Sequence, residues 1–185
     1  MEEGGYGLVV DSDNLLPHDF LSLDEKLDLP LYHLSDVPWE HPRVVRRENR
    51  GGVEVYYWSV KNLWGRVMHV FAGPKQGIRI KKPVLNVGAI DYVLSVVESM
   101  DDLFARVVAD EITIGIVYDK SGISEVPFIV ATKHLGHSSY PRLGHHKAIR
   151  RKIYAMALAR LYWKTGYALP ALRYAATALI WGLSF

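Results

Sequence analysis

Hydrophobic residues recur at three- and four-residue steps along residues 87–109, and this period predicts an amphipathic helix. Asn86 stands just before it and is a suitable N-cap. Two further helices are predicted at about 146–164 and 170–182, the second with Pro170 in its first turn. We expect these two helices to pack together through their apolar residues Ile149, Ile153, Met156, Leu172, Ala176, Leu179 and Ile180.

Shorter runs of β-branched and aromatic residues predict strands. Residues 112–118 and 126–132 are two such runs, and the turn-forming residues 119–122 between them predict a β-hairpin. Other strands are expected at residues 53–57, 66–71 and 78–80.

The first 42 residues have a different pattern. Pro17, Pro30, Pro38 and Pro42 interrupt short apolar runs, which predicts an extended arm with one short helix beginning near Ser22. The expected fold is therefore α+β and predominantly helical, with an extended N-terminal arm, a central helix and β-hairpin, and a C-terminal helix pair. Two parts are predicted, an acidic Pro-rich arm at 1–42 and a DNA-binding body at 43–185.

Charge changes this picture, because it occurs in blocks. The net charge is −9 over residues 1–41, +8 over 42–82, −6 over 83–125 and +9 over 126–185, where no acidic residue occurs. The blocks cancel to the formal total of +2. Such segregation favours a polyanionic partner for the basic blocks and a neighbouring subunit for the acidic blocks.

Composition excludes several functions. The 185 residues include no Cys, which rules out disulfides, thiolate metal sites and Cys nucleophiles. The scarcity of Cys and Gln indicates a thermophilic source. No secretion signal is visible at the start of the sequence, and the apolar stretch 167–185 is interrupted by Pro170 and Arg173, so no membrane span is expected. The histidines lack the spacing of a metal site, so neither a metal nor a cofactor is predicted.

The strongest candidate for chemistry is the segment 133–152, which holds six Lys or Arg, four His and no acid. Bases in the first turn of a helix oppose its macrodipole unless an anion binds there, and a DNA phosphate is such an anion. The alternative is a solvated basic face. A second basic patch follows residue 42 and alternates with aromatic residues, which suits either single-strand stacking or an ordinary sheet with one apolar face. The predicted DNA-binding residues are Arg43, Arg46, Arg47, Arg50, Lys75, Arg79, Lys81, Lys82, Lys133, Arg142, Lys147, Arg150, Arg151 and Lys152.

From residue 112 onward, the order of a hairpin, a Lys-bearing strand end, a His-rich loop and a Tyr-bearing helix resembles the RecB-like PD-(D/E)XK nucleases, particularly the CRISPR-associated adaptation nuclease. Lys133 and Tyr154 match the Lys and Tyr of that family, and Asp119 or Asp91 could match its first metal-binding acid. Ala131 and Arg150 stand where the family has the acid and the Gln of its metal site. Because Mg²⁺ needs carboxylate ligands, this resemblance implies a scaffold that binds DNA without cutting it.

A Cys-free nuclease-like chain with an arm resembles the nucleocapsid proteins of filamentous viruses of hyperthermophilic archaea (the tristromavirus type). This resemblance implies a non-enzymatic protein that coats double-stranded DNA, polymerises into a helical filament with itself and a paralogous capsid protein, and is found in the virion after assembly in the host cytoplasm. Two alternatives remain open at this point. One is a non-catalytic nucleic-acid-binding adaptor, and the other is a surviving metal-dependent nuclease that uses Asp91, Asp119 and Lys133.

Overall fold

The computed structural model describes residues 7–10, 14–36, 44–61, 70–73, 76–81, 83–101, 110–134 and 147–182. The strands of this part are β1 (Gly7–Val10), β2 (Asn14–Leu15), β3 (Leu31–Ser35), β4 (Val44–Arg50), β5 (Val53–Ser59), β6 (Gly77–Ile80), β7 (Glu125–Val130) and β8 (Lys133–His134). Its helices are α1 (Phe20–Leu27), α2 (Val87–Glu98), α4 (Asp110–Lys120), α5 (Lys147–Lys164) and α6 (Ala168–Gly182).

A six-stranded mixed sheet organises the molecule, in the order β1-β6-β3-β7-β5-β4. The central strands β3 and β7 run parallel, with His33 opposite Phe128, and the other neighbours in this sheet are antiparallel. All five residues of β3 are buried. Strands β2 and β8 form a separate two-stranded ladder.

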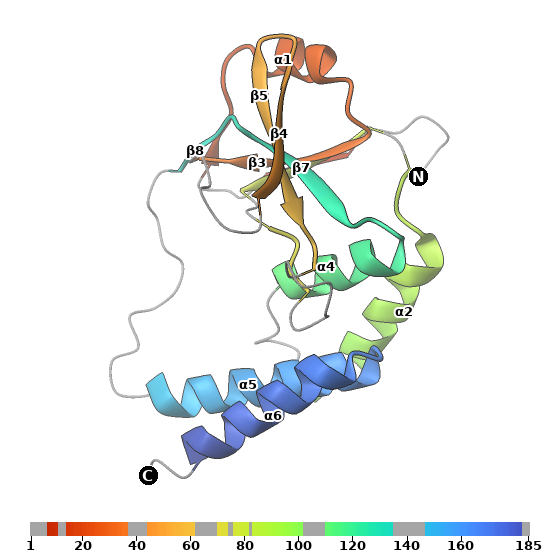
Figure 1. Ribbon diagram of the computed structural model, residues 1–185, viewed down its shortest axis with the longest axis vertical. Helices are drawn as coiled ribbons and strands as arrows, with labels where there is room; N and C mark the ends of the chain where they lie inside the picture. Colours follow the sequence, from red (N-terminus) through yellow and green to blue (C-terminus); the bar gives the residue numbers. More distant parts are fainter. Residues whose placement is uncertain are drawn as a thin grey trace.

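Helices cover both faces of this sheet, as Figure 1 shows. On one face α1 packs through Phe20 and Leu27 against buried residues of β3, β5 and β7. On the other face lie α4 and α2, with the α5–α6 pair beyond them at the far end of the molecule. The larger apolar core therefore lies between the sheet and the four later helices.

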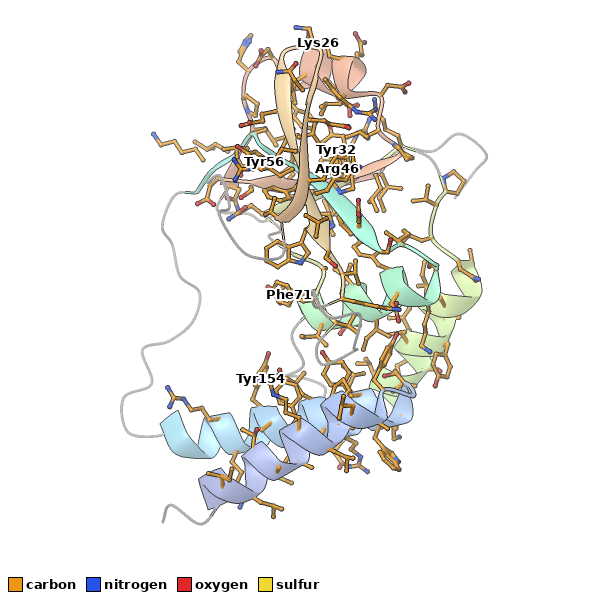
Figure 2. All side chains as sticks on the ribbon, in the orientation of Figure 1. Lys26, Tyr32, Arg46, Tyr56, Phe71 and Tyr154 are labelled. Carbon is orange, nitrogen blue, oxygen red and sulfur yellow. The ribbon has the colours of Figure 1, made fainter. Side chains whose placement is uncertain are left out.

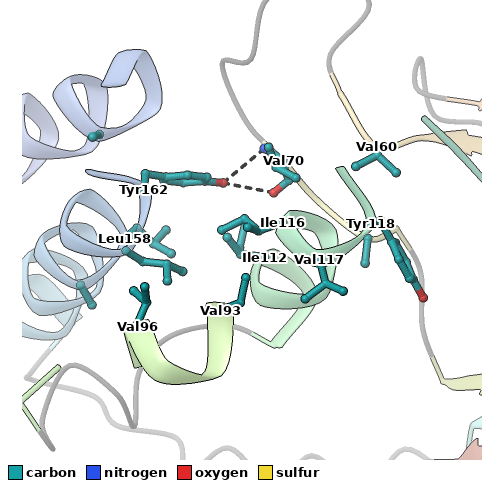
Figure 3. Packing of buried hydrophobic residues seen from close by; sticks show 14 of the residues in the cluster. Val60, Val70, Val93, Val96, Ile112, Ile116, Val117, Tyr118, Leu158 and Tyr162 are labelled. Atoms are coloured by element: carbon teal, nitrogen blue, oxygen red, sulfur yellow. Dashed lines mark hydrogen bonds between the residues drawn. The ribbon is translucent and has the colours of Figure 1, made fainter. Parts of the chain in front are cut away.

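Figure 3 shows the centre of this larger core, where α2, α4 and α5 meet. Val93, Ile116 and Leu158 are fully buried there. Tyr162 is fully buried as well, and its hydroxyl donates to the Val70 carbonyl at 3.1 Å and accepts from the Val70 N–H at 3.2 Å. The hydroxyl thus satisfies both backbone groups of Val70, a residue outside the strands.

The expectation of a predominantly helical fold with an extended arm is wrong. The helices hold less than half, and the strands more than a quarter, of the described residues. The first 42 residues contribute β1, α1 and the central strand β3, so their described part belongs to the same sheet as the later chain. Pro17 lies before the start of α1 and Pro30 lies directly before β3, and proline is compatible with both of these positions.

The predicted hairpin is also wrong. Residues 110–120 form α4, whereas the second predicted strand exists as β7 and pairs with β3 and β5. The misleading signal was the β-branched run at Ile112, Ile114 and Ile116. Ile112 and Ile116 are buried while Thr113 and Ile114 are partly buried, so α4 has little polar face to reveal a helical period.

Four predicted helices are present. The short helix expected near Ser22 is α1, which begins at Phe20. Asn86 caps α2, accepting a hydrogen bond from the Ala89 N–H at 3.3 Å, and residues 102–109 of that prediction lie outside the described part. The C-terminal pair appears as α5 and α6, but not with the expected packing. Helix α6 buries Ala171 and Ala178, which permit close approach to α5, and its larger side chains Leu172, Leu179 and Ile180 are exposed, as is Ala176.

The predicted strands at 53–57 and 78–80 are confirmed as parts of β5 and β6. The one predicted at 66–71 lies mostly outside the described residues. No helix in the described part of the chain is both long and apolar enough to cross a membrane.

Candidate nucleic-acid interface

Two of the predicted DNA-binding residues, Arg79 and Lys81 of the segment around β6, bind a carboxylate inside the protein. Arg79 donates from Nη2 and Nε to Oδ2 of Asp24 at 2.9 and 3.2 Å. Lys81 Nζ lies 3.7 Å from Oδ1 of the same carboxylate and bonds to the Asp24 carbonyl. The Tyr32 hydroxyl donates to Asp24 at 2.6 Å. The side chains of Arg79 and Lys81 are only 14% and 13% exposed, so their charges compensate the buried Asp24 carboxylate and are not presented to a partner.

Electrostatics in this cluster favours the ionised carboxylate. Burial raises the pKa of Asp24, but the hydrogen bonds from Arg79 and Tyr32 and the charges of Arg79 and Lys81 outweigh it, and the net pKa lies below its ordinary value. Asp24 is not among the functional residues predicted from the sequence. Its signal was a polar residue in the middle of the buried stripe Phe20, Asp24 and Leu27, whose spacing is that of one helix face.

On β4 a second group of predicted residues is largely neutralised. Arg46 donates to Glu48 at 2.7 Å and lies 3.7 Å from Glu125, and Arg50 pairs with Glu48 as well. The Tyr57 hydroxyl donates to Glu48 at 2.5 Å. This hydrogen bond, followed by the one from Arg50, lowers the pKa of the Glu48 carboxyl. The described part of this group therefore carries little net charge.

Arg47, the remaining described cation of β4, lies 5.1 Å above the ring of Tyr56, which in turn stacks on Phe128 with centroids 5.2 Å apart. Tyr56, Tyr57 and Trp58 are 5%, 6% and 2% exposed. Rings this deeply buried offer no face to a nucleic-acid base, so the structure favours their reading as sheet core over single-strand stacking.

The charge blocks seen in the sequence are paired within the chain. Ion pairs join Asp24 to Arg79, Asp119 to Lys61, Glu125 to Arg46 and Asp101 to Arg160. Each of these pairs joins an acidic block to a basic block. Some acids of each acidic block therefore have intramolecular partners. Four of the six described cations of the second block, Arg46, Lys61, Arg79 and Lys81, pair with these acids.

The fourth block, residues 126–185, contains no acid, and its Arg160 pairs with Asp101 of the third block. Helix α5 begins at Lys147 with no acidic residue in its first turn, and Arg150, Arg151 and Lys152 follow at once. The Arg151 side chain is exposed, and Lys152 is partly exposed with no ion-pair partner among the described residues. The first two turns of α5 thus combine four cations with the positive end of a helix dipole.

Lys133 lies apart from that group. It follows β7 and sits on β8 beside the sheet, whereas α5 lies at the opposite end of the molecule (Figure 1). Figure 2 shows the same separation between Arg46 in the sheet and Tyr154 on α5. Lys133 is exposed and lines a mostly apolar groove of about 440 Å³ with Leu15, Leu23 and Thr132.

The remaining predicted residues are only partly described. Lys147 and Arg150 belong to α5, but their side chains are outside the described part. Outside it entirely lie Arg43, Lys75, Lys82 and Arg142.

The acids offered for a nuclease site lie far from Lys133. Asp119 comes before β7, where it pairs with Lys61 at 2.6 Å and accepts from the Tyr167 hydroxyl at 2.5 Å. Asp91 belongs to α2, whose cap residue Asn86 donates from its N–H to Ser121 Oγ at this same end of β7. Lys133 lies past the other end, and six residues of extended strand span about 16 Å. Neither acid can therefore bind a metal ion in the same active site as Lys133.

Comparisons with protein-family models, with curated proteins and with solved structures found no match to this chain.

Proposed function

We propose that this chain is a structural, non-catalytic protein that binds the phosphate backbone of double-stranded DNA through the first turns of α5 and assembles along the DNA. One observation carries the proposal. Most described cations of the second block are bound to carboxylates. Helix α5 instead begins with the cations Lys147, Arg150, Arg151 and Lys152 at the positive end of its dipole, and of these Lys152 is partly exposed with no ion-pair partner among the described residues.

Four cations within two helical turns suit a polyanion better than a small anion. Each contact to a DNA phosphate releases a condensed counterion, and this release drives binding without sequence preference. The backbone N–H groups at the start of a helix can add hydrogen bonds to the same phosphates. The mode of binding proposed is therefore backbone contact rather than base reading.

The resemblance to the nucleocapsid proteins of filamentous archaeal viruses is the basis for three parts of the proposal. These are assembly along DNA, a paralogous protein as a second component, and location in the virion. A monomeric adaptor would use the same surface, and the two differ in whether bound copies touch. The nuclease alternative has less support, because Asp91 and Asp119 lie at the end of β7 remote from Lys133.

The test compares two charge-matched variants in binding to a DNA duplex over a salt series from about 50 to 200 mM. Arg150→Gln with Arg151→Gln removes two cations from α5, and Arg46→Gln with Arg50→Gln removes two from β4. We expect the α5 variant to flatten the slope of log K against log salt by about 2, because each lost phosphate contact removes roughly 0.9 from the slope.

The β4 variant is the control, and we expect it to keep the wild-type slope because Arg46 and Arg50 are both already paired with Glu48. An α5 variant with the wild-type slope would refute the proposed interface. DNA that is shortened in Mg²⁺ or Mn²⁺ would refute the non-catalytic assignment. Electron microscopy of the complexes distinguishes regular filaments from the small particles expected of an adaptor.

A further inference from the structure

Helix α6 carries an apolar stripe on the side that faces away from α5. The exposed fractions of Leu169, Leu172, Leu179 and Ile180 are 51%, 61%, 70% and 65%. Leu169, Leu172, Ala176 and Leu179 follow one another at steps of three, four and three residues. These are the steps of a helix seam that packs against another helix.

Helix α2 carries a second exposed stripe, in which apolar and acidic residues alternate. Val87 is 68% exposed and Leu94 is 50% exposed, while Asp91 and Glu98 are exposed between and after them. The steps here are four, three and four residues. Neither Asp91 nor Glu98 has an ion-pair partner among the described residues.

The charges of the two stripes are complementary. The stripe of α6 has no acid, and Arg173 lies on its border, exposed and without an ion-pair partner in the described part of the chain. Two α6 stripes packed together would bring like charges into one small contact, and so would two α2 stripes. An α6 stripe against an α2 stripe instead brings Arg173 toward Asp91 or Glu98 and covers the exposed leucines of both.

We infer that α6 of one copy docks on α2 of a second copy of this chain. Both stripes remain exposed in a single chain, so each copy offers one of each. A contact between two different surfaces is heterologous, and repeated copies of such a contact form a ring or an open helical polymer. This inference rests on the assembly part of the proposed function and names its surfaces.

The contact is small. One helix face on each side covers less than the standard interface of about 800 Å² per partner, so we expect weak association between free copies. Copies held side by side on one DNA molecule would associate more strongly, because their effective concentration is higher.

The experiment is sedimentation of the full chain without DNA, with one face blocked at a time. Leu172→Gln with Leu179→Gln blocks α6, and Val87→Gln with Leu94→Gln blocks α2. We expect the wild type to grow into large species as its concentration rises and each variant alone to remain monomeric. An equal mixture of the two variants should form dimers that grow no further, because each copy keeps one intact face.

A control and a charge exchange complete the test. Leu21→Gln removes an exposed leucine of α1, 75% exposed and outside both stripes, and should leave association unchanged. Arg173→Glu should weaken association several-fold, and adding Glu98→Lys should restore it. An α2-blocked variant that still polymerises, or a wild type that stays monomeric at every concentration, would overturn the inference. Wild-type affinity of the blocked variants for a DNA duplex too short to hold two copies shows that such a failure concerns the contact and not DNA binding.

Discussion

Replacing Asp24 by Asn removes the one carboxylate that Arg79 and Lys81 share, and we expect a large loss of stability. Asp24 is 5% exposed, and its partners Arg79, Lys81 and Tyr32 stay in place around the uncharged amide. Removing one partner of a buried ion pair typically costs about 3–5 kcal/mol, because the remaining charge is left without compensation. For a chain of this size each kcal/mol lowers Tm by about 2–4 °C, so Tm should fall by roughly 6–20 °C.

Thermal and denaturant unfolding measure this loss. The matched control is Asp101→Asn, which breaks an exposed ion pair with Arg160. The side chain of Asp101 is 70% exposed and that of Arg160 is 45% exposed. Such a pair contributes less than about 1 kcal/mol. Combining Asp24→Asn with Arg79→Gln should cost clearly less than the sum of the two single changes, because both changes remove the same ion pair. A loss of stability no larger than that of the control would refute the role of Asp24 as the buried carboxylate that compensates Arg79 and Lys81.

Three further predictions concern stability. The pKa of Asp24 lies below its ordinary value of 3.8, so its ionised form stabilises the fold above about pH 4. This contribution disappears as the pH falls through the folded-state pKa. When unfolding is measured over an acid pH series, the Asp24→Asn variant should therefore lose less stability below about pH 4 than the wild type. Tyr162→Phe should destabilise by about 1–3 kcal/mol in denaturant unfolding, since the buried N–H and carbonyl of Val70 lose their partner, and a change near zero would mean that water replaces the hydroxyl. Gly115→Ala should lower Tm, because a Cβ on this residue of α4 would lie 2.9 Å from backbone atoms of Phe71; an unchanged Tm would show that the two segments can separate without cost.

Sequence periodicity located the elements that have one polar and one apolar side. Helix α2 shows its period because its outer side faces solvent, and Asn86 marks its start. Helix α4 was not predicted because it lies between the sheet and other helices. It has no solvent-facing side on which polar residues would reveal the helical period. Strand β3 was missed for a related reason, since all its residues are buried and its sequence does not alternate.

The candidate interface was predicted only in part. The acid-free C-terminal block and its cations on α5 follow directly from the sequence. The sequence does not show which cations are already paired, because the positive charges of Arg79 and Lys152 look alike in a sequence, although only Arg79 has a carboxylate partner among the described residues. Leu172, Leu179 and Ile180 of α6 were likewise predicted to pack on α5, but they are exposed. Ala171 and Ala178 are buried instead, and Tyr174 of α6 stacks on Tyr162 of α5.

The sequence by itself determined the charge of each block, the absence of cysteine chemistry and the helices with an exposed side, because these depend on residue identity and on neighbours within a few positions. Only the tertiary structure decided where the charges go. Asp24 and Arg79 are 55 positions apart, and they meet because the packing of α1 on the sheet brings the carboxylate next to β6. An ion pair depends on distance in space and on burial, and neither can be read from position along the chain.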